Sequence, residues 1–243
     1  MGTIVDLTSS QESDTDSSVA STGPTAPRGY LSVPPSGSGP GVLVVQEWWG
    51  LDSGIKEMAD RLAVEGFVAL APDLYRGELA GHTEMDKAGE LMNSMPFERA
   101  AADMSAAVDF LIADEAVTSD AIGVVGFCMG GMLSFFIAAN RPDAVRALVP
   151  FYGFPSGDSQ PDYTKITAAV QGHMADHDDF FPPAAARELE GRLQALGLDA
   201  TLTVYPGSGH AFMAPHNALG TQDHDLYQRI WPQVVAFLHT HLS

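Results

Sequence analysis

The stretch AIGVVGFCMGGMLSFFIAAN, residues 121–140, joins two halves with different patterns. Residues 121–126 form a short apolar run, which is typical of a strand covered on both faces, and residues 130–140 continue as an apolar helix. Between the halves lie Gly126, Cys128 and Gly130, in the spacing of a turn that presents a nucleophile between two glycines. Side chains at the glycine positions would clash where the two backbones approach. The spacing therefore predicts a sharp strand-to-helix turn that carries Cys128.

Residues 121–139 are also nearly as long and as apolar as a membrane span. Glycines at positions 123, 126, 130 and 131 interrupt this run. A strand, a turn and a helix account for both the glycines and the length, so we predict that this segment does not cross a membrane.

The alternation of buried strand and helix repeats on both sides of the turn. The expected strands span residues 41–46, 67–71, 121–126, 146–151, 168–173 and 200–205, and the expected helices span 54–65, 85–94, 97–113, 130–140, 183–196 and 223–241. This order predicts an α/β fold with a doubly wound, mostly parallel sheet that is flanked by helices on both faces. In such sheets the functional residues lie on loops at the carboxyl ends of the strands.

The length of 243 residues fits a single substantial domain, which we expect at residues 29–243. Residues 1–28 are expected to form an N-terminal edge strand and a connector. Residues 3–7 and 29–33 are β-like and predict an edge hairpin or meander, whereas residues 9–27 are rich in Ser, Thr, Pro and Gly and predict partial flexibility.

The formal net charge of −19 comes from 12 basic and 31 acidic residues. Nucleic-acid binding depends on Lys and Arg that neutralise phosphates, so this balance argues against a nucleic-acid partner. The single cysteine cannot form an intramolecular disulfide, and residues 1–18 lack a basic segment followed by an apolar one. We predict a cytoplasmic protein, a monomer or homodimer, with no cofactor and no membrane partner.

Cys128 is the candidate nucleophile. The predicted turn places it at a helix N-terminus, where the helix dipole favours a thiolate and the backbone N–H of Met129 can face a developing oxyanion. The alternative is a structural cysteine that packs as a small apolar residue. The strand and helix that flank the turn favour the functional interpretation.

A thiol is mostly protonated at neutral pH, so Cys128 needs a base within reach, and histidine is the usual one. The chain has eight histidines, and His210 lies near the end of the last expected strand. His173 and His177 are its competitors, whereas His82 and His216 have no expected strand before them. The order nucleophile, acid, histidine along the chain favours His210.

The acid that orients the histidine should lie in the loop after the strand at 168–173. This loop offers Asp176, Asp178 and Asp179, and their spacing alone does not choose among them. Carboxylates beside His177 also raise the question of a metal site. A contiguous loop lacks the spaced ligands that make a metal signal specific, so we predict no metal here.

Four regions together resemble the dienelactone hydrolases, the carboxymethylenebutenolidase family of α/β-hydrolases. The resemblance extends from about Gly29 to Leu242. It rests on QEWWG (46–50), APDLYRG (71–77), GFCMGG (126–131), and the pair GHMADHDDFFPP (172–183) and YPGSGHAF (205–212). It implies the α/β-hydrolase fold and the opening of a lactone or a small carboxylic ester through a Cys-His-Asp triad and a thioester intermediate.

The resemblance also implies roles for single residues. Cys128 matches the nucleophile, His210 the base and Asp178 the acid. Glu47 matches a glutamate that pairs with the resting thiol and releases it when substrate binds. The backbone N–H of Trp48 is expected to complete the oxyanion hole with that of Met129.

The substrate-binding residues depart from the family pattern. The family holds a substrate carboxylate with two arginines, of which the first corresponds to Arg76, shifted by one position, and the second falls on Ala214. Aromatic residues are the other candidates for the pocket, although about half of them are expected to be ordinary core residues. The candidate binding residues are Arg76, Tyr75, Trp49, Tyr152 and Phe212, with Trp48 and Phe127 as further aromatic candidates.

Two other functions fit the same turn. One is a binding protein that keeps the fold without turnover, and the other is a peroxide-reactive thiol that needs an external thiol to resolve it. Ester turnover distinguishes both from a hydrolase. The natural substrate and its pathway stay open at this point.

Overall fold

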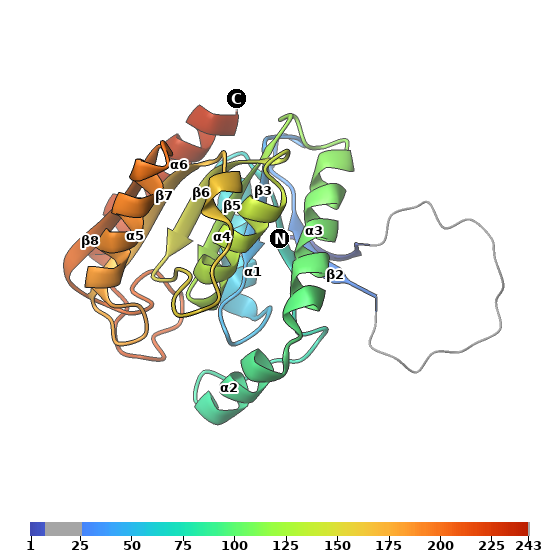
Figure 1. Ribbon diagram of the computed structural model, residues 1–243. Helices are drawn as coiled ribbons and strands as arrows, with labels where there is room; N and C mark the ends of the chain where they lie inside the picture. Colours follow the sequence, from blue (N-terminus) through green and yellow to red (C-terminus); the bar gives the residue numbers. More distant parts are fainter. Residues whose placement is uncertain (8–25, 243) are drawn as a thin grey trace.

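The computed structural model describes residues 1–7 and 26–242 (Figure 1). The flexibility predicted for residues 9–27 falls, apart from residues 26 and 27, outside this described part. None of the helices within it combines the length and apolar character that a membrane crossing requires.

The described residues form an eight-stranded sheet in the order β1-β2-β4-β3-β5-β6-β7-β8. At the edge formed by β1, the pairings of β1 with β2 and of β2 with β4 are antiparallel, and the remaining pairings are parallel. The strands are β1 (Thr3–Asp6), β2 (Arg28–Ser32), β3 (Gly41–Val45), β4 (Val68–Pro72), β5 (Ile122–Phe127), β6 (Val145–Phe151), β7 (Ala169–His177) and β8 (Ala200–Gly209). The predicted α/β-hydrolase fold is confirmed.

Helices cover both faces of the sheet (Figure 1). On one face lie α1 (Ser53–Val64) and α6 (His224–Leu242), and on the other lie α3 (Phe97–Ala113), α4 (Met129–Asn140) and α5 (Pro183–Ala195). The helix α2 (Met85–Ser94) projects beyond the sheet, and a short 3-10 helix spans Tyr163–Lys165.

Strand β3 shows why the central strands are apolar throughout. Leu43 and Val45 pack into the core beneath α3 and α4, whereas Val42 and Val44 pack into the core beneath α1 and α6. All four side chains are fully buried. Successive side chains of a strand point to opposite faces, so a strand covered on both faces needs an apolar residue at every position.

Strands β7 and β8 run further than their sequence patterns predict. They were expected to end at residues 173 and 205, yet their pairing continues to His177 and Gly209 across an irregularity in register. Extended pairing between neighbouring strands overrides the turn-forming character of residues 206–209. As a result Asp176, expected in the loop after this strand, lies in β7 itself, and the acidic loop that starts at Asp178 begins at the same end of the sheet as the loop that carries His210.

Candidate active site

The turn between β5 and α4 has the strained geometry that its glycines predict. Cys128 has φ 54° and ψ −117°, which is rare for a residue with a side chain. A Cβ on Gly126 would lie 2.1 Å from the carbonyl oxygen of Gly130, and one on Gly130 would lie 2.2 Å from that of Val45. Both positions therefore require glycine.

Cys128 lies among groups that act on its charge in opposite directions. Burial raises the pKa of the thiol well above its usual value, and the negative charges of Glu47 and Asp178 raise it further. The backbone N–H groups of Met129 and Trp48 act as hydrogen-bond donors toward the sulfur and lower the pKa in part. The residue nevertheless keeps part of its surface accessible. The resting thiol is therefore neutral, and two N–H donors converge on it.

His210 follows β8 and is fixed by Asp178. Its Nδ1 lies 2.7 Å from Oδ2 of Asp178, whose side chain is completely buried. The other carboxylate oxygen accepts hydrogen bonds of 2.9 Å from the backbone N–H groups of Phe180 and Phe181. A carboxylate held in this way fixes the orientation of the imidazole and leaves its Nε2 for a second partner.

The competing histidines occupy different surroundings. His173 is buried, its Nδ1 lies 2.8 Å from the Tyr205 hydroxyl, and burial lowers its pKa to about 3. His177 is exposed to solvent. Asp176, in the last part of β7, accepts a hydrogen bond from the backbone N–H of Gly207 in β8, and Asp179 is exposed. Of the three candidate carboxylates, Asp178 is the one in contact with His210.

Cys128 and His210 line the same cavity, which has a volume of about 170 Å³. Its wall is mainly apolar and includes two residues of the acidic loop. The lining residues are Trp48, Met92, Cys128, Met129, Met132, Phe180, Phe181, His210 and Leu219.

Five of these lining residues were not predicted from the sequence. Phe180 and Phe181 directly follow the acid, and Met132 lies one helical turn after Cys128, so proximity along the chain could have identified them. Met92 on α2 and Leu219 in the loop before α6 carry no such local signal. They reach the cavity through tertiary packing alone.

Most of the predicted aromatic binding residues lie behind the cavity wall. Tyr152 is fully buried with its ring 5.1 Å from that of His210, and Phe212 packs against Tyr152 at 5.2 Å. The hydroxyl of Tyr75 lies 3.5 Å from the sulfur of Met129. These side chains and buried Trp49 are absent from the described cavity lining, whereas Trp48 belongs to it.

Arg76, the predicted anchor for a substrate carboxylate, is paired with Asp103 of α3. Its Nη2 and Nε donate hydrogen bonds of 2.7 and 3.2 Å to the two carboxylate oxygens. Arg76 is not among the residues that line the cavity, and Ala214 is buried. The described cavity wall thus includes no arginine or lysine to meet a negatively charged substrate.

Glu47, next to Cys128, is also paired with a histidine. Its Oε2 lies 2.7 Å from Nε2 of His216, and both side chains are largely buried. The other oxygen, Oε1, is buried and has no hydrogen-bond partner in the described part of the chain. Sequence reasoning set His216 aside because no expected strand precedes it, and nothing local predicts this contact.

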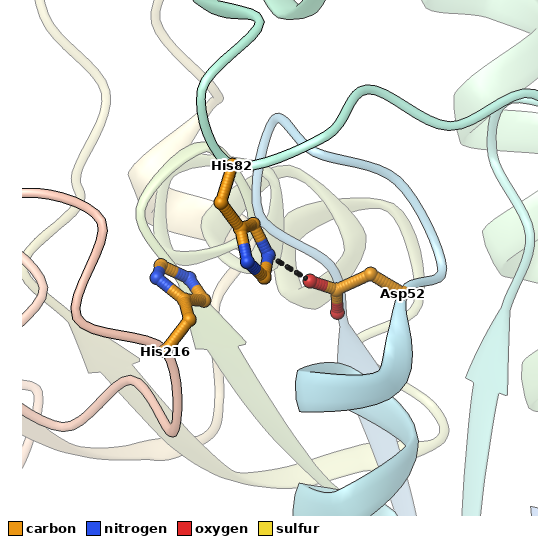
Figure 2. A group of neighbouring side chains, drawn as sticks. All are labelled: Asp52, His82 and His216. Carbon is orange, nitrogen blue, oxygen red and sulfur yellow. Dashed lines mark hydrogen bonds and ion pairs between the residues drawn. The ribbon is translucent and has the colours of Figure 1, made fainter.

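His216 lies beside His82 and Asp52, and these three side chains come from three separate loops (Figure 2). Each offers one ligand atom, and the three atoms lie within 4.8 Å of one another, which makes the group a candidate for holding a metal ion. However, Nε2 of His82 lies 2.6 Å from Oδ2 of Asp52, and the imidazole rings stack at 4.0 Å with an angle of 33°. Because Nε2 of His82 already faces Asp52 and Nε2 of His216 already faces Glu47, the arrangement fits two histidine–carboxylate pairs better than a metal site.

Comparisons with known proteins identify the family and the fold. The model of a family described as the dienelactone hydrolase family matches residues 28–242. Protein usf of Aquifex pyrophilus is 38% identical over 89% of this chain and 94% of its own length. A protein of Aquifex aeolicus named after carboxymethylenebutenolidase is 35% identical with the same coverage. A solved Klebsiella pneumoniae structure described as a dienelactone hydrolase is 26% identical, with a TM-score of 0.75 over 88% of this chain and 93% of that one.

Proposed function

The chain belongs to the dienelactone hydrolase family and is an ester or lactone hydrolase, and from this premise we propose that it acts through a Cys128-His210-Asp178 triad and a thioester intermediate. One observation carries the proposal. Cys128 and His210 line one cavity, and His210 is oriented by a buried carboxylate. A nucleophile, a base and a group that orients the base are the three parts that covalent acyl transfer requires.

In the proposed first step the proton of the Cys128 thiol passes to Nε2 of His210, and the sulfur attacks the carbonyl carbon of the substrate. The backbone N–H groups of Met129 and Trp48 stabilise the oxyanion that forms, because they already point at the sulfur, and the sulfur becomes bonded to the carbon that carries the oxyanion. His210 then protonates the departing alkoxide, which leaves a thioester on Cys128. In the second half His210 removes a proton from water, the hydroxide displaces the thiolate, and the acid is released.

The raised pKa of the thiol supports a nucleophile that is activated by its substrate. Burial and the charge of Glu47 keep Cys128 neutral at rest. A neutral thiol reacts slowly with peroxide, which argues against a protein whose function is peroxide sensing. In our proposal Glu47 releases the Cys128 thiol when substrate binds, and the thiolate forms only then. The family resemblance implies this order of events.

The cavity favours a small, uncharged, apolar acyl group. Its 170 Å³ is less than the roughly 300–1,000 Å³ of pockets that hold drug-sized ligands. Methionine and aromatic side chains form most of the wall, and Arg76 is engaged by Asp103. We therefore propose small neutral esters as better substrates than dienelactone, whose carboxylate would enter the cavity without a cationic partner.

Hydrolysis of p-nitrophenyl acetate and of dienelactone, at pH 7 to 8 with a metal chelator present, tests the proposal. We expect wild-type protein to hydrolyse both, the neutral ester more efficiently, and both Cys128→Ala and His210→Gln to lose turnover. The exposed His177 provides the matched control, because His177→Gln should keep the wild-type rate. If Cys128→Ala retains that rate, this turn is not the catalytic centre. A binding protein of the same fold would then be the better interpretation.

A further inference from the structure

A row of four charged or titratable side chains leads from the nucleophile to the protein surface. Glu47 lies next to Cys128, His216 contacts Glu47, His82 stacks on His216, and Asp52 contacts His82. The exposed fraction of the side chain increases from 6% at Glu47 and 9% at His216 to 32% at His82, and Asp52 behind His82 is 11% exposed. The row therefore connects a buried carboxylate at the active site to solvent.

The four members of the row come from three loops at one end of the sheet, because Glu47 and Asp52 share the loop between β3 and α1. Glu47 follows β3, Asp52 caps the N-terminus of α1, His82 lies between β4 and α2, and His216 lies between β8 and α6. The Asp52 carboxylate accepts a hydrogen bond of 2.9 Å from the backbone N–H of Ile55. Three loops that converge in this way fix the histidine pair between the carboxylates of Glu47 and Asp52. Figure 2 shows the pair with Asp52.

Glu47 and His216 are each surrounded by other charged or titratable groups. Glu47 is faced by Cys128, by the buried hydroxyl of Tyr152 and by His216. His216 is faced by Glu47, by Asp52 and by His82, with the edge of Trp49 packed against both imidazoles. Burial alone lowers the pKa of His216, but the hydrogen bond and charge of Glu47, together with the charge of Asp52, outweigh it and the net pKa is raised.

We propose that His216 is a positioning residue of the thiol reaction: it holds the Glu47 carboxylate and, as an imidazolium, offsets the negative charge that this carboxylate places beside Cys128. The inference rests on the proposed function, because it takes Cys128 as the nucleophile. His82 and Asp52 support His216 from behind, with the Asp52 carboxylate favouring its charged form. No substrate contact is assigned to these three residues.

This role produces a pH dependence with a defined sign. While His216 carries its proton, its positive charge compensates Glu47 and the Cys128 thiolate forms more readily. As the pH rises through the raised pKa of His216, that proton is lost, Glu47 is left uncompensated, and the pKa of the thiol increases. Cys128 in the wild type is therefore more reactive near neutral pH than it would be with an uncharged residue at position 216.

Alkylation of Cys128 by iodoacetamide tests the proposal without depending on ester turnover. The chain has a single cysteine, so the rate reports on this thiol alone. His216→Gln keeps a hydrogen-bond donor near Glu47 and removes the charge, and we expect alkylation about tenfold slower at pH 6 to 7, since one unit of thiol pKa is a tenfold change in thiolate. The wild-type and His216→Gln profiles should converge at higher pH, because the side chain at position 216 is then uncharged in both. His216→Lys should remain faster than His216→Gln up to pH 9.

Two further variants complete the design. His224→Gln changes an exposed histidine of α6 and should follow the wild-type profile. Asp52→Asn keeps a side chain that caps α1 and removes the charge behind the histidines. The pH at which alkylation loses the contribution of protonated His216 should therefore be lower in Asp52→Asn than in the wild type, and this comparison does not require His216→Gln to fold.

The proposal is overturned if the profile of His216→Gln overlays that of the wild type, if His216→Lys is as slow as His216→Gln, or if Asp52→Asn leaves the profile unchanged. These outcomes say nothing against Cys128 as the nucleophile, which the turnover of Cys128→Ala tests separately. Including a chelator in each alkylation keeps metal binding to the histidines from contributing to the profile.

Discussion

Of the four non-glycine residues with a positive φ in the described part of the chain, three gather around Cys128 and His210, and the fourth is Arg76. Cys128, Tyr152 and Ala211 have φ angles of 54°, 35° and 64°, in a region that residues with side chains rarely occupy. Tyr152 packs against the His210 ring, and Ala211 directly follows it. Such angles cost on the order of 1–3 kcal/mol each and persist only where the surroundings impose them. The chain therefore gives up stability to place its nucleophile and its histidine.

The pairing of Asp178 with His210 leads to a residue-level prediction. Asp178→Asn keeps the size of the side chain and an oxygen for the two backbone N–H donors, but removes the charge that stabilises a protonated imidazole. We expect the turnover of p-nitrophenyl acetate to fall by about 10³–10⁴, the size of effect known for the acid of a triad. Steady-state kinetics and a thermal melt measure both consequences. We expect the melting temperature to change little.

Asp179 offers the matched control for this prediction, because it is adjacent, exposed and of the same chemical type. Asp179→Asn should leave turnover within about twofold of the wild type, as is usual for surface substitutions away from a site. Equal losses in the two variants would show that the general negative charge of the loop, and not the contact with His210, supports catalysis.

At the scale of elements, the turn at Cys128 depends on how closely the segment that follows β6 approaches it. A Cβ at Gly153 would lie 1.9 Å from the carbonyl oxygen of Cys128. Gly153→Ala must therefore push the two segments apart. We expect a loss of at least about 2 kcal/mol in the free energy of unfolding, together with reduced turnover, because overpacking of this kind displaces backbone. Urea denaturation and ester hydrolysis measure the two effects.

Gly191 provides the contrasting substitution. It lies inside α5, and a Cβ there would meet no atom within 4 Å. Gly191→Ala should raise the free energy of unfolding by about 0.5–1 kcal/mol, because glycine is unfavourable in a helix interior. If Gly153→Ala were as stable as Gly191→Ala, the close approach at the turn would not be a structural requirement.

The order of the elements could be predicted from the sequence because each carries its own periodicity. The expected helix at 97–113 and the α3 helix have the same bounds, and the strand expected at 41–46 differs from β3 by one residue. Cys128, His210 and Asp178 were likewise identified from spacing, chain order and resemblance. Their assignment to catalysis stays a prediction, as does the domain boundary at residue 28.

The contacts between elements could not be predicted in the same way. The pairing of Arg76 with Asp103, the contact of Glu47 with His216, and the position of Met92 in the cavity wall join segments that are far apart in the sequence or carry no shared pattern. Such contacts depend on how loops and helices pack at the end of the sheet. A single sequence carries information on local periodicity but not on that packing.

At the scale of the whole molecule, the net charge of −19 should affect which substrates reach the cavity. A protein of this charge repels an anion at a distance, and the repulsion acts over a Debye length of about 30 Å at 0.01 M salt but only about 8 Å at 0.15 M. For dienelactone, an anion at neutral pH, we expect kcat/KM to rise about two- to fivefold over this range as salt screens the repulsion. For p-nitrophenyl acetate, which is neutral, kcat/KM should stay constant, and this substrate controls for effects of salt on the protein itself. A fall in kcat/KM for dienelactone would mean that a local cation attracts it, and Arg76, released from Asp103, would be the residue to test with Arg76→Gln.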